Sequence, residues 1–164
     1  MTQEISASRL GKAVEYLVAA SCVLASDGKL NVSTSMVDDE GVDLVFHRSD
    51  HVATLAVQVK SRSLGTVTLS QYERFLANVR SETFRPRPSL YVLFVAADVP
   101  GGTFDLAWLV PSEVLAARAR PNARGRLRFS ASPKANSADQ WREYRVSRAE
   151  LPQRILSVLD SLER

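Results

Sequence analysis

Three polar side chains near the first predicted hairpin have the types and spacing that phosphate chemistry needs. Gln58 and Lys60 lie two residues apart in the apolar run LAVQVKS, residues 55–61, so they share one face of an extended strand. Asp43 lies in the preceding apolar segment. A carboxylate, an amide oxygen and an ammonium group could together hold a divalent cation and offset charge that develops on a phosphate.

The pairing of these two segments predicts that the three side chains converge. If Asp50 and His51 form a two-residue turn, the residue numbers of each pair add up to 101, and Asp43 lies opposite Gln58. Directly opposed Cβ atoms lie about 4.5 to 5.5 Å apart. In this register the other face of the hairpin is entirely apolar, with the pairs Val42–Val59, Leu44–Val57 and Phe46–Leu55. A longer turn or a bulge is the alternative to the two-residue turn.

A second acid could come from the helix that the apolar spacing predicts over residues 6–26. Glu15 lies off the most apolar stripe of this helix and shares a side with Gly11, where the missing side chain would permit close approach of another backbone. Mg²⁺ often takes only one or two carboxylates, together with water and phosphate oxygens. Asp43, Gln58 and Glu15 are therefore candidate metal ligands, with Lys60 near the attacking water.

The remaining elements must position these residues. Strands are predicted at residues 30–37, 41–47 and 52–60, and the last two form the hairpin. Ser70 and Glu73 have the spacing of a capping box and predict a helix to about Val79, with Tyr72, Phe75, Leu76 and Val79 on its apolar side. A continuous apolar stretch at 90–96 predicts a strand buried on both faces. Strands are also expected at 104–110 and 126–130, and helices after Pro111 and over 151–162.

These elements predict an α/β fold with a mixed central β-sheet flanked by helices. A chain of 164 residues, 45% hydrophobic and 24% charged, suits one domain with one core. The single cysteine, Cys22, excludes an internal disulfide and a cysteine-built zinc cluster, which favours a reducing, cytoplasmic location. We expect no membrane association, because the longest apolar run, residues 90–97, is far shorter than a membrane span and residues 1–10 do not resemble an export signal.

The charged residues are unevenly distributed, although the net charge is only +3. Residues 1–50 hold four Lys/Arg and eight Asp/Glu, whereas residues 51–164 hold seventeen and ten. The later segment could attract a polyanion, and a solvated mixed surface would explain the charge alone equally well. The same two alternatives apply to Arg85, Arg87 and the group from Arg118 to Arg128, which could contact a phosphate backbone.

The residues around the candidate site resemble the PD-(D/E)XK nuclease superfamily, which has a restriction-endonuclease-like fold. The resemblance rests on Gly11-Lys12-Ala13-Val14-Glu15 in the first helix, Gly41-Val42-Asp43-Leu44-Val45 in one strand and Val57-Gln58-Val59-Lys60-Ser61 in the next. The glutamine makes the chain most similar to the Mrr-like and Holliday-junction-resolvase-like branches. The resemblance covers about residues 6–97, as an α-β-β-β-α-β core, and leaves residues 98–164 as an extension with a C-terminal strand and helix.

The resemblance implies a metal-dependent DNA endonuclease that acts in restriction and defence or in repair and recombination. Asp43, Gln58 and the backbone carbonyl of Val59 would bind Mg²⁺, for which Mn²⁺ could substitute. Lys60 would position or activate the attacking water, and Glu15 would bind the metal directly or through water. DNA would be the substrate, a homodimer would suit the cutting of both strands, and the extension could dock a partner protein.

Other interpretations stay open beside this one. Gln58 replaces a carboxylate and Val42 replaces the usual proline, so the chain could be a nuclease-fold DNA-binding or protein-interaction module that has lost efficient metal binding. A fold used only for assembly is a third alternative. Asp43 could instead be one more solvated acid after residues 38–40, and Lys60 a charge that protects a strand end. His47 and His51 are expected at the surface near the turn, and Trp108 and Trp141 in the core.

Overall fold

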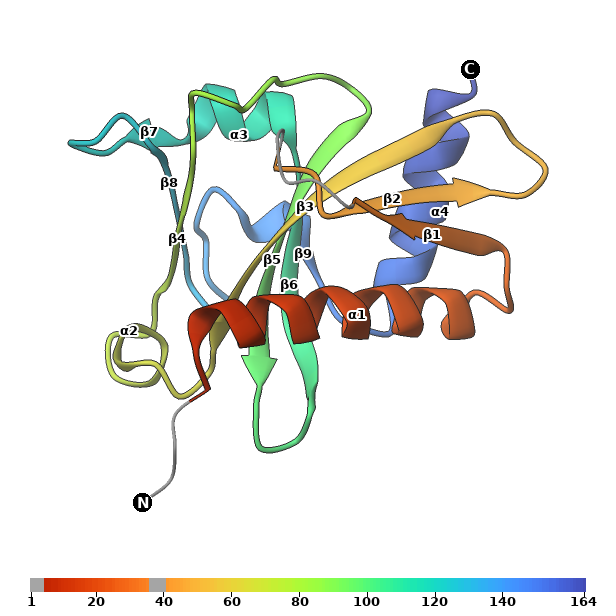
Figure 1. Cartoon of the computed structure of the whole chain (residues 1–164). Coiled ribbons are helices and arrows are strands. Elements are labelled where there is room, and N and C mark those ends of the chain that lie inside the picture. Colours follow the sequence, from red (N-terminus) through yellow and green to blue (C-terminus); the bar gives the residue numbers. More distant parts are fainter. Residues whose placement is uncertain (1–4, 36–40) are drawn as a thin grey trace.

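A six-stranded mixed sheet runs through the centre of the molecule and separates two layers of packing (Figure 1). This computed structural model describes residues 5–35 and 41–164. The strand order is β1-β2-β3-β5-β6-β9; β3 and β5 are parallel, and the other neighbouring pairs are antiparallel. The strands are β1 (Leu30–Thr34), β2 (Leu44–Arg48), β3 (Thr54–Ser63), β5 (Leu90–Asp98), β6 (Thr103–Pro111) and β9 (Arg145–Val146).

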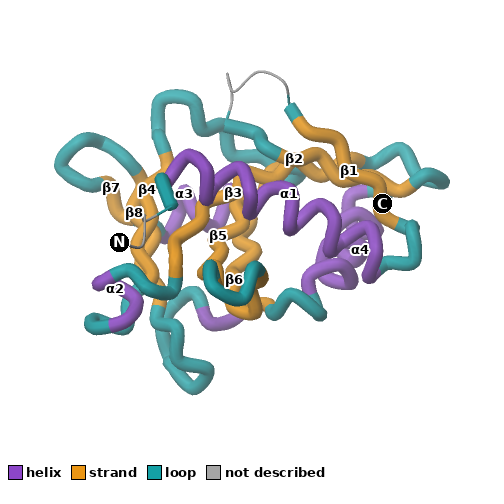
Figure 2. Tube along the Cα trace, turned by 60° about the horizontal axis from the view of Figure 1, so that its bottom comes forward, coloured by secondary structure: helices purple, strands orange, loops and turns teal. Residues whose placement is uncertain are grey.

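Helices α1 (Ala7–Ala25) and α4 (Leu151–Leu162) cover one face of this sheet (Figure 2). The side chain of Ser6 caps α1 by accepting a hydrogen bond from the Arg9 N–H. Val14, Val18 and Cys22 recur at helical spacing and are buried against alternate residues of β2, β3 and β5. The helices predicted over residues 6–26 and 151–162 are therefore confirmed. We call the layer between these helices and the sheet the α1-side core.

A smaller sheet covers the other face, with the strand order β4-β8-β7. Its strands are β4 (Phe75–Val79), β7 (Arg120–Pro121) and β8 (Leu127–Ala131), and α3 (Ser112–Arg118) packs beside them. Aromatic rings fill this layer, which we call the aromatic core. Phe94 of β5 stacks on Phe129 of β8 with 3.7 Å between ring centroids, and both tryptophans are buried around them, as predicted.

The helix predicted from Ser70 to Val79 is wrong. The helical turn α2 (Val67–Ser70) ends where that helix should begin, and the backbone of Glu73 has a φ of 50°, which no right-handed helix contains. Residues 75–79 form β4, in which Phe75, Ala77 and Val79 are buried and Leu76 and Asn78 are less so. Burial at every second position is the period of a strand, and this segment pairs along its whole length with β8.

The other predicted strands are confirmed as β5, β6 and β8. β1 corresponds to the strand predicted at 30–37, of which positions 36 and 37 lie outside the described residues. A short 3-10 helix (Arg142–Tyr144) leads into β9. In the described part of the chain, no helix is long and apolar enough to cross a membrane.

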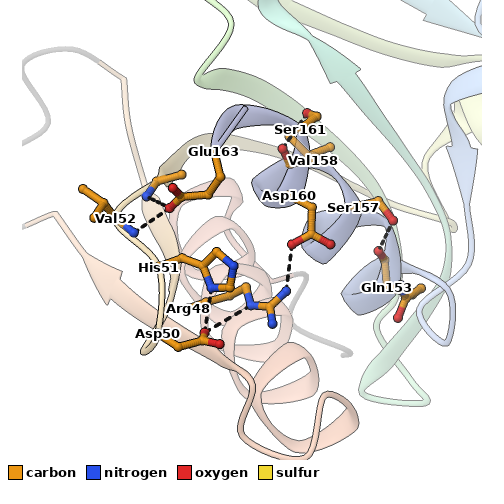
Figure 3. Close-up of polar contacts among 11 residues, drawn as sticks. Arg48, Asp50, His51, Val52, Gln153, Ser157, Val158, Asp160, Ser161 and Glu163 are labelled. Carbon is orange, nitrogen blue, oxygen red and sulfur yellow. Dashed lines mark hydrogen bonds and ion pairs between the residues drawn. The ribbon is translucent and has the colours of Figure 1, made fainter.

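The β2–β3 hairpin keeps its predicted register but has a longer turn. Leu44 pairs with Val57 and His47 with Thr54, as expected, and the ladder then opens into a loop. Figure 3 shows how α4 holds this loop: Arg48 Nη1 lies 2.7 Å from Asp160 Oδ1. Oε1 of Glu163 accepts hydrogen bonds from the N–H groups of residues 52 and 53. Five residues, 49–53, connect the two strands, so these contacts with the C-terminal helix fix the loop in place of a tight turn.

Candidate active site

The end of the hairpin opposite the turn contains a β-bulge. Leu44 pairs with Val57, yet the N–H of Asp43 also donates to the carbonyl oxygen of Val57 at 3.0 Å. Two residues of one strand therefore oppose one residue of the other, which is the pattern of a bulge and re-aims the side chains beside it. The predicted pairs Asp43–Gln58 and Val42–Val59 are not formed.

The bulge separates residues that a regular ladder would have placed on one face. Val59 is buried in the α1-side core, whereas Val42 packs against the aromatic core on the other side. Ala56 also packs against the aromatic core, so strand alternation places Gln58 and Lys60 on that same face. The sequence-based prediction that Asp43 and Gln58 share a face through direct pairing is therefore wrong.

The Asp43 carboxylate instead binds the backbone of the strand that carries the other candidates. Its Oδ2 atom accepts a hydrogen bond from the Val59 N–H at 2.6 Å. Val59 lies between Gln58 and Lys60, so this bond fixes the carboxylate at the centre of the Gln58-Val59-Lys60 segment. Asp43 is half-buried, and a short hydrogen bond to an ionised acceptor in such a place is among the stronger ones in proteins.

Helix α1 adds a second carboxylate and a cation to this region. Lys12 Nζ lies 2.7 Å from Glu15 Oε2, one helical turn along; the Glu15 side chain is only 12% exposed and that of Lys12 58%. Glu15 raises the pKa of Lys12 through this hydrogen bond and through its charge, and the charge of Asp43 adds to the effect. The charges of Glu15 and Asp43 thus both act on Lys12. No role was predicted for Lys12, although its i, i+3 spacing from Glu15 is visible in the sequence.

Gln58 lies against the backbone where the chain enters the site. Gly41 has a φ of 71°, and a Cβ atom added to it would lie 2.6 Å from Nε2 of Gln58. The lack of a side chain at position 41 therefore lets the Gln58 amide pack over the turn that precedes Asp43. The acids at positions 38–40 directly precede this turn and lie outside the described residues.

A cleft of about 1120 Å³ opens beside Val59 and Lys60. Its walls come from the first turns of α1, the second half of β3, the loop that follows β3 and the turn between β5 and β6. Asp43, Gln58 and Glu15 are not among its lining residues, so the cleft meets the candidate site at Val59 and Lys60. Gly11 lines the cleft, and no atom of the described residues outside its own helix backbone lies within 4 Å of the position of its missing Cβ. For the part of the chain that the structure describes, the expected close approach of another backbone is therefore wrong.

Arg62 is a second cation in this cleft, and the sequence analysis missed it. It follows Lys60 by two residues on β3, which places both side chains on one face of the strand. Its Nη1 donates to the carbonyl oxygen of Ser61 at 2.8 Å, and partial burial lowers its pKa. The alternation of Gln58, Lys60 and Arg62 was a visible signal that the polar face of the strand continues past the lysine.

The candidate residues supply donor atoms of the kinds that a hard cation such as Mg²⁺ binds. Asp43 and Glu15 supply carboxylates, Gln58 an amide oxygen and Val59 a backbone carbonyl, and Mg²⁺ needs few protein ligands when water and phosphate oxygens complete its shell. Within residues 5–35 and 41–164, no three His, Cys, Asp or Glu side chains are grouped closely enough to hold a metal ion by themselves. Any ion here would therefore depend on water and substrate oxygens.

Comparison with known proteins finds similarity at the level of the fold. No family model matches the chain, and no curated protein matches its sequence. Among solved structures, the chain is similar to a bacterial homing endonuclease, with a TM-score of 0.58 and 14% sequence identity, over 97% of this chain and 99% of that one. At this identity the likeness shows the fold. It confirms a mixed, nuclease-like α/β architecture that includes residues 98–164, and it does not test the resemblance to the PD-(D/E)XK superfamily or to any of its branches.

Proposed function

We propose that this protein is a metal-dependent DNA endonuclease of the PD-(D/E)XK type that hydrolyses phosphodiester bonds in restriction and defence or in repair and recombination. The observation that carries the proposal is the 2.6 Å hydrogen bond from the Val59 N–H to Asp43, because it joins the carboxylate to the segment that presents Lys60 to the cleft. The endonuclease-like fold supports the same conclusion.

Each residue of the site has a distinct task in this proposal. Asp43, Gln58, Glu15 and the carbonyl of Val59 would hold Mg²⁺ or Mn²⁺, and the bound ion would act as a Lewis acid and supply an activated water. Lys60 would orient the attacking water and offset negative charge on the phosphate oxygens. Arg62, one step farther along the same face, would hold the DNA strand in the cleft by binding a neighbouring phosphate.

The test is cleavage of plasmid, branched and single-stranded DNA with Mg²⁺ or Mn²⁺. Asp43→Asn keeps an oxygen acceptor for the Val59 N–H and removes the charge, and Lys60→Ala removes the ammonium group. We expect each variant to lose about 100-fold or more of the cleavage rate while remaining folded. Asp105→Asn and Lys29→Ala change the same residue types at exposed positions outside the site and should cleave like the wild type. Cleavage that survives both site substitutions would refute the proposal.

A second candidate function is a nuclease-fold DNA-binding module with little or no catalysis. Two observations favour it: Gln58 stands where the family has a carboxylate, and the described residues contain no group of three acidic, His or Cys side chains able to hold a metal. Calorimetry with Mg²⁺ and Mn²⁺ separates the candidates, since the module predicts DNA binding without heat from either ion. If Gln58→Glu creates cleavage that the wild type lacks, the module is the correct assignment.

A further inference from the structure

The smaller sheet presents a row of polar and basic side chains on its outer face. Asn78 of β4 pairs with Arg128 of β8, and Arg128 pairs with Arg120 of β7, so the three residues lie side by side across the sheet. All three are exposed, whereas the neighbouring Phe129 and Ala77 face the aromatic core. We call β4, β7 and β8, with the turn between β7 and β8 and residues 80–82, the basic arm.

The charge of the arm is large and is not neutralised by its own carboxylates. Between residues 118 and 128 there are five arginines and no acid. Arg118 pairs with Glu143 at 2.8 Å and lies over the ring of Tyr144, so it belongs to the body of the protein. In the part of the chain that the structure describes, the ion pairs involve neither Arg80 nor the remaining four arginines at 120, 124, 126 and 128.

The tip of the arm is hollowed and its backbone is fixed. Arg80, Arg124 and Arg126 line a hollow of about 210 Å³ together with Ser81 and Glu82. Side-chain hydrogen bonds help to hold the turn: Oδ1 of Asn122 accepts from the N–H groups of residues 124 and 126, and the Ser81 hydroxyl donates to the carbonyl oxygen of residue 125. Because the backbone of the turn is already ordered, only the arginine side chains remain to be ordered around an anion, which lowers the cost of binding.

The composition of the arm points to a phosphate backbone and not to a lipid surface. An amphipathic segment that inserts into a membrane surface presents large apolar side chains beside its cations. The large exposed hydrophobic residues of the described chain all lie outside the arm, at Ile5, Tyr16, Leu24, Val52, Leu64, Val67, Tyr72 and Val99. Arginine forks bind phosphate oxygens in pairs, and contacts of this kind position a protein on DNA without reading its sequence.

We propose that the basic arm is a second DNA-binding site, which grips the phosphate backbone of duplex DNA outside the cleft. The inference rests on the proposed function in taking DNA as the substrate. Figures 1 and 2 both show β4, β7 and β8 on the side of the molecule where α1 begins, and the first turns of α1 line the cleft. A duplex that leaves the cleft on this side would pass the arm.

The test compares two arm variants with a control of equal charge change. Arg120→Gln with Arg128→Gln removes the row across the sheet, and Arg124→Gln with Arg126→Gln removes the cations of the tip. Arg148→Gln with Arg154→Gln changes two exposed arginines at and just before α4, on the other side of the molecule. Binding to a fluorescent duplex is measured in EDTA, so that no strand is cut, over a series of salt concentrations.

Each phosphate contact contributes about 0.9 to the slope of log K against log salt concentration. Each arm variant lacks two arginines, so we expect it to lower the magnitude of this slope by about 1.8. The loss of affinity should be the same for duplexes of unrelated sequence, and the control should keep the wild-type slope. An unchanged slope in both arm variants would overturn the proposal. A second outcome would also overturn it. If the protein bound phosphatidylserine vesicles more tightly than DNA, and the arm substitutions abolished that binding, the arm would be a membrane-binding site.

The result separates this inference from the proposed function. If the wild type cuts DNA and the arm variants bind it like the wild type, the arm proposal fails and the nuclease stands. If the wild type binds DNA through the arm and cuts nothing with Mg²⁺ or Mn²⁺, the arm stands and the nuclease fails. A wild type that neither binds nor cuts DNA overturns both.

Discussion

Gly41 and Gly11 lie near the candidate site and differ in what their backbone positions require. Gly41 has a φ of 71°, in the left-handed region, and lies under the amide of Gln58. Gly11 lies inside α1, where glycine is a poor helix former, and the position of its missing Cβ is open. One glycine is therefore required by the fold, and the other leaves the cleft open.

Alanine at these two positions should change stability in opposite directions. Gly41→Ala should lower the free energy of unfolding by about 1 to 2 kcal/mol, because an L-residue is strained in the left-handed conformation. Gly11→Ala should raise it by about 0.5 to 1 kcal/mol, because alanine restricts the unfolded chain and favours helix. Urea denaturation of both variants measures the two changes. If Gly41→Ala were neutral, the left-handed turn before Asp43 would be wrong.

Cys22 makes stability depend on pH in the alkaline range. Burial raises the pKa of its thiol from an ordinary value of 9.0 to about 12. Above pH 9 the Cys22 thiol loses its proton in the unfolded chain but keeps it in the folded chain. The free energy of unfolding is therefore unaffected by this group below pH 9 and falls as the pH rises toward 12. We expect the wild type to lose stability relative to Cys22→Ala between pH 9 and pH 11, as measured by denaturation at each pH. A constant difference between the two proteins would show that the thiol is accessible to water.

The sequence suggested which residues could form a site, and this assignment stays a prediction; their relative placement was not predictable from the sequence. Strand alternation explains why Gln58 and Lys60 share a face, and the apolar pairs fixed the register between Leu44–Val57 and His47–Thr54. The bulge at Asp43 lies just beyond that ladder. A bulge depends on one backbone hydrogen bond, and no side-chain pattern in the sequence encodes it.

At the scale of elements, the segment from Ser70 to Val79 shows how tertiary packing overrides local signals. Its apolar residues fit a helical stripe and an alternating strand, and the capping-box spacing favoured the helix. The strand forms because Phe75, Ala77 and Val79 can all enter the aromatic core at once, opposite Phe129 and its neighbours on β8. Elements with one strong period and clear ends, such as α1 and α4, were predicted correctly because no second interpretation competed.

The strand and helix interpretations of this segment predict different losses of unfolding free energy when two aromatic residues are replaced by alanine. In a helix, Tyr72 and Phe75 would share a buried face, whereas in the structure Tyr72 is 70% exposed and Phe75 is fully buried. Phe75→Ala should therefore cost about 3 to 5 kcal/mol of unfolding free energy, and Tyr72→Ala less than about 0.5 kcal/mol. Phe75→Leu is a milder substitution that should stay folded and lose less. If chemical denaturation showed equal losses of unfolding free energy for the alanine substitutions at positions 72 and 75, the helix interpretation would be correct and β4 would be wrong.

At the scale of the whole molecule, residues 98–164 are part of the central fold and not an addition to its edge. β6 pairs along the length of β5, and α4 contributes Leu151, Ile155 and Leu159 to the α1-side core. The aromatic core takes Trp108, Phe129 and Trp141 from the same part of the chain. We therefore expect a chain that ends at residue 98 to remain unfolded, because it would expose both faces of β5.

β5 and β6 send alternate residues into both cores, and this connection should make the molecule unfold as one unit. Val92 and Phe94 face the aromatic core, whereas Leu93 and Val95 face the α1-side core. Both tryptophans belong to the aromatic core, so their fluorescence reports on that layer alone. Leu159→Ala, which opens a cavity in the α1-side core, should lower the unfolding free energy by about 2 to 5 kcal/mol.

The same loss should appear in tryptophan fluorescence and in far-ultraviolet circular dichroism, because a two-state molecule gives one transition to every probe. Ser157→Ala, at an exposed position of the same helix, should leave both transitions within about 0.5 kcal/mol of the wild type. If Leu159→Ala shifted the circular dichroism transition and left the fluorescence transition unmoved, the two cores would unfold separately. The central sheet would then connect two independent units, and residues 1–164 would not form a single domain.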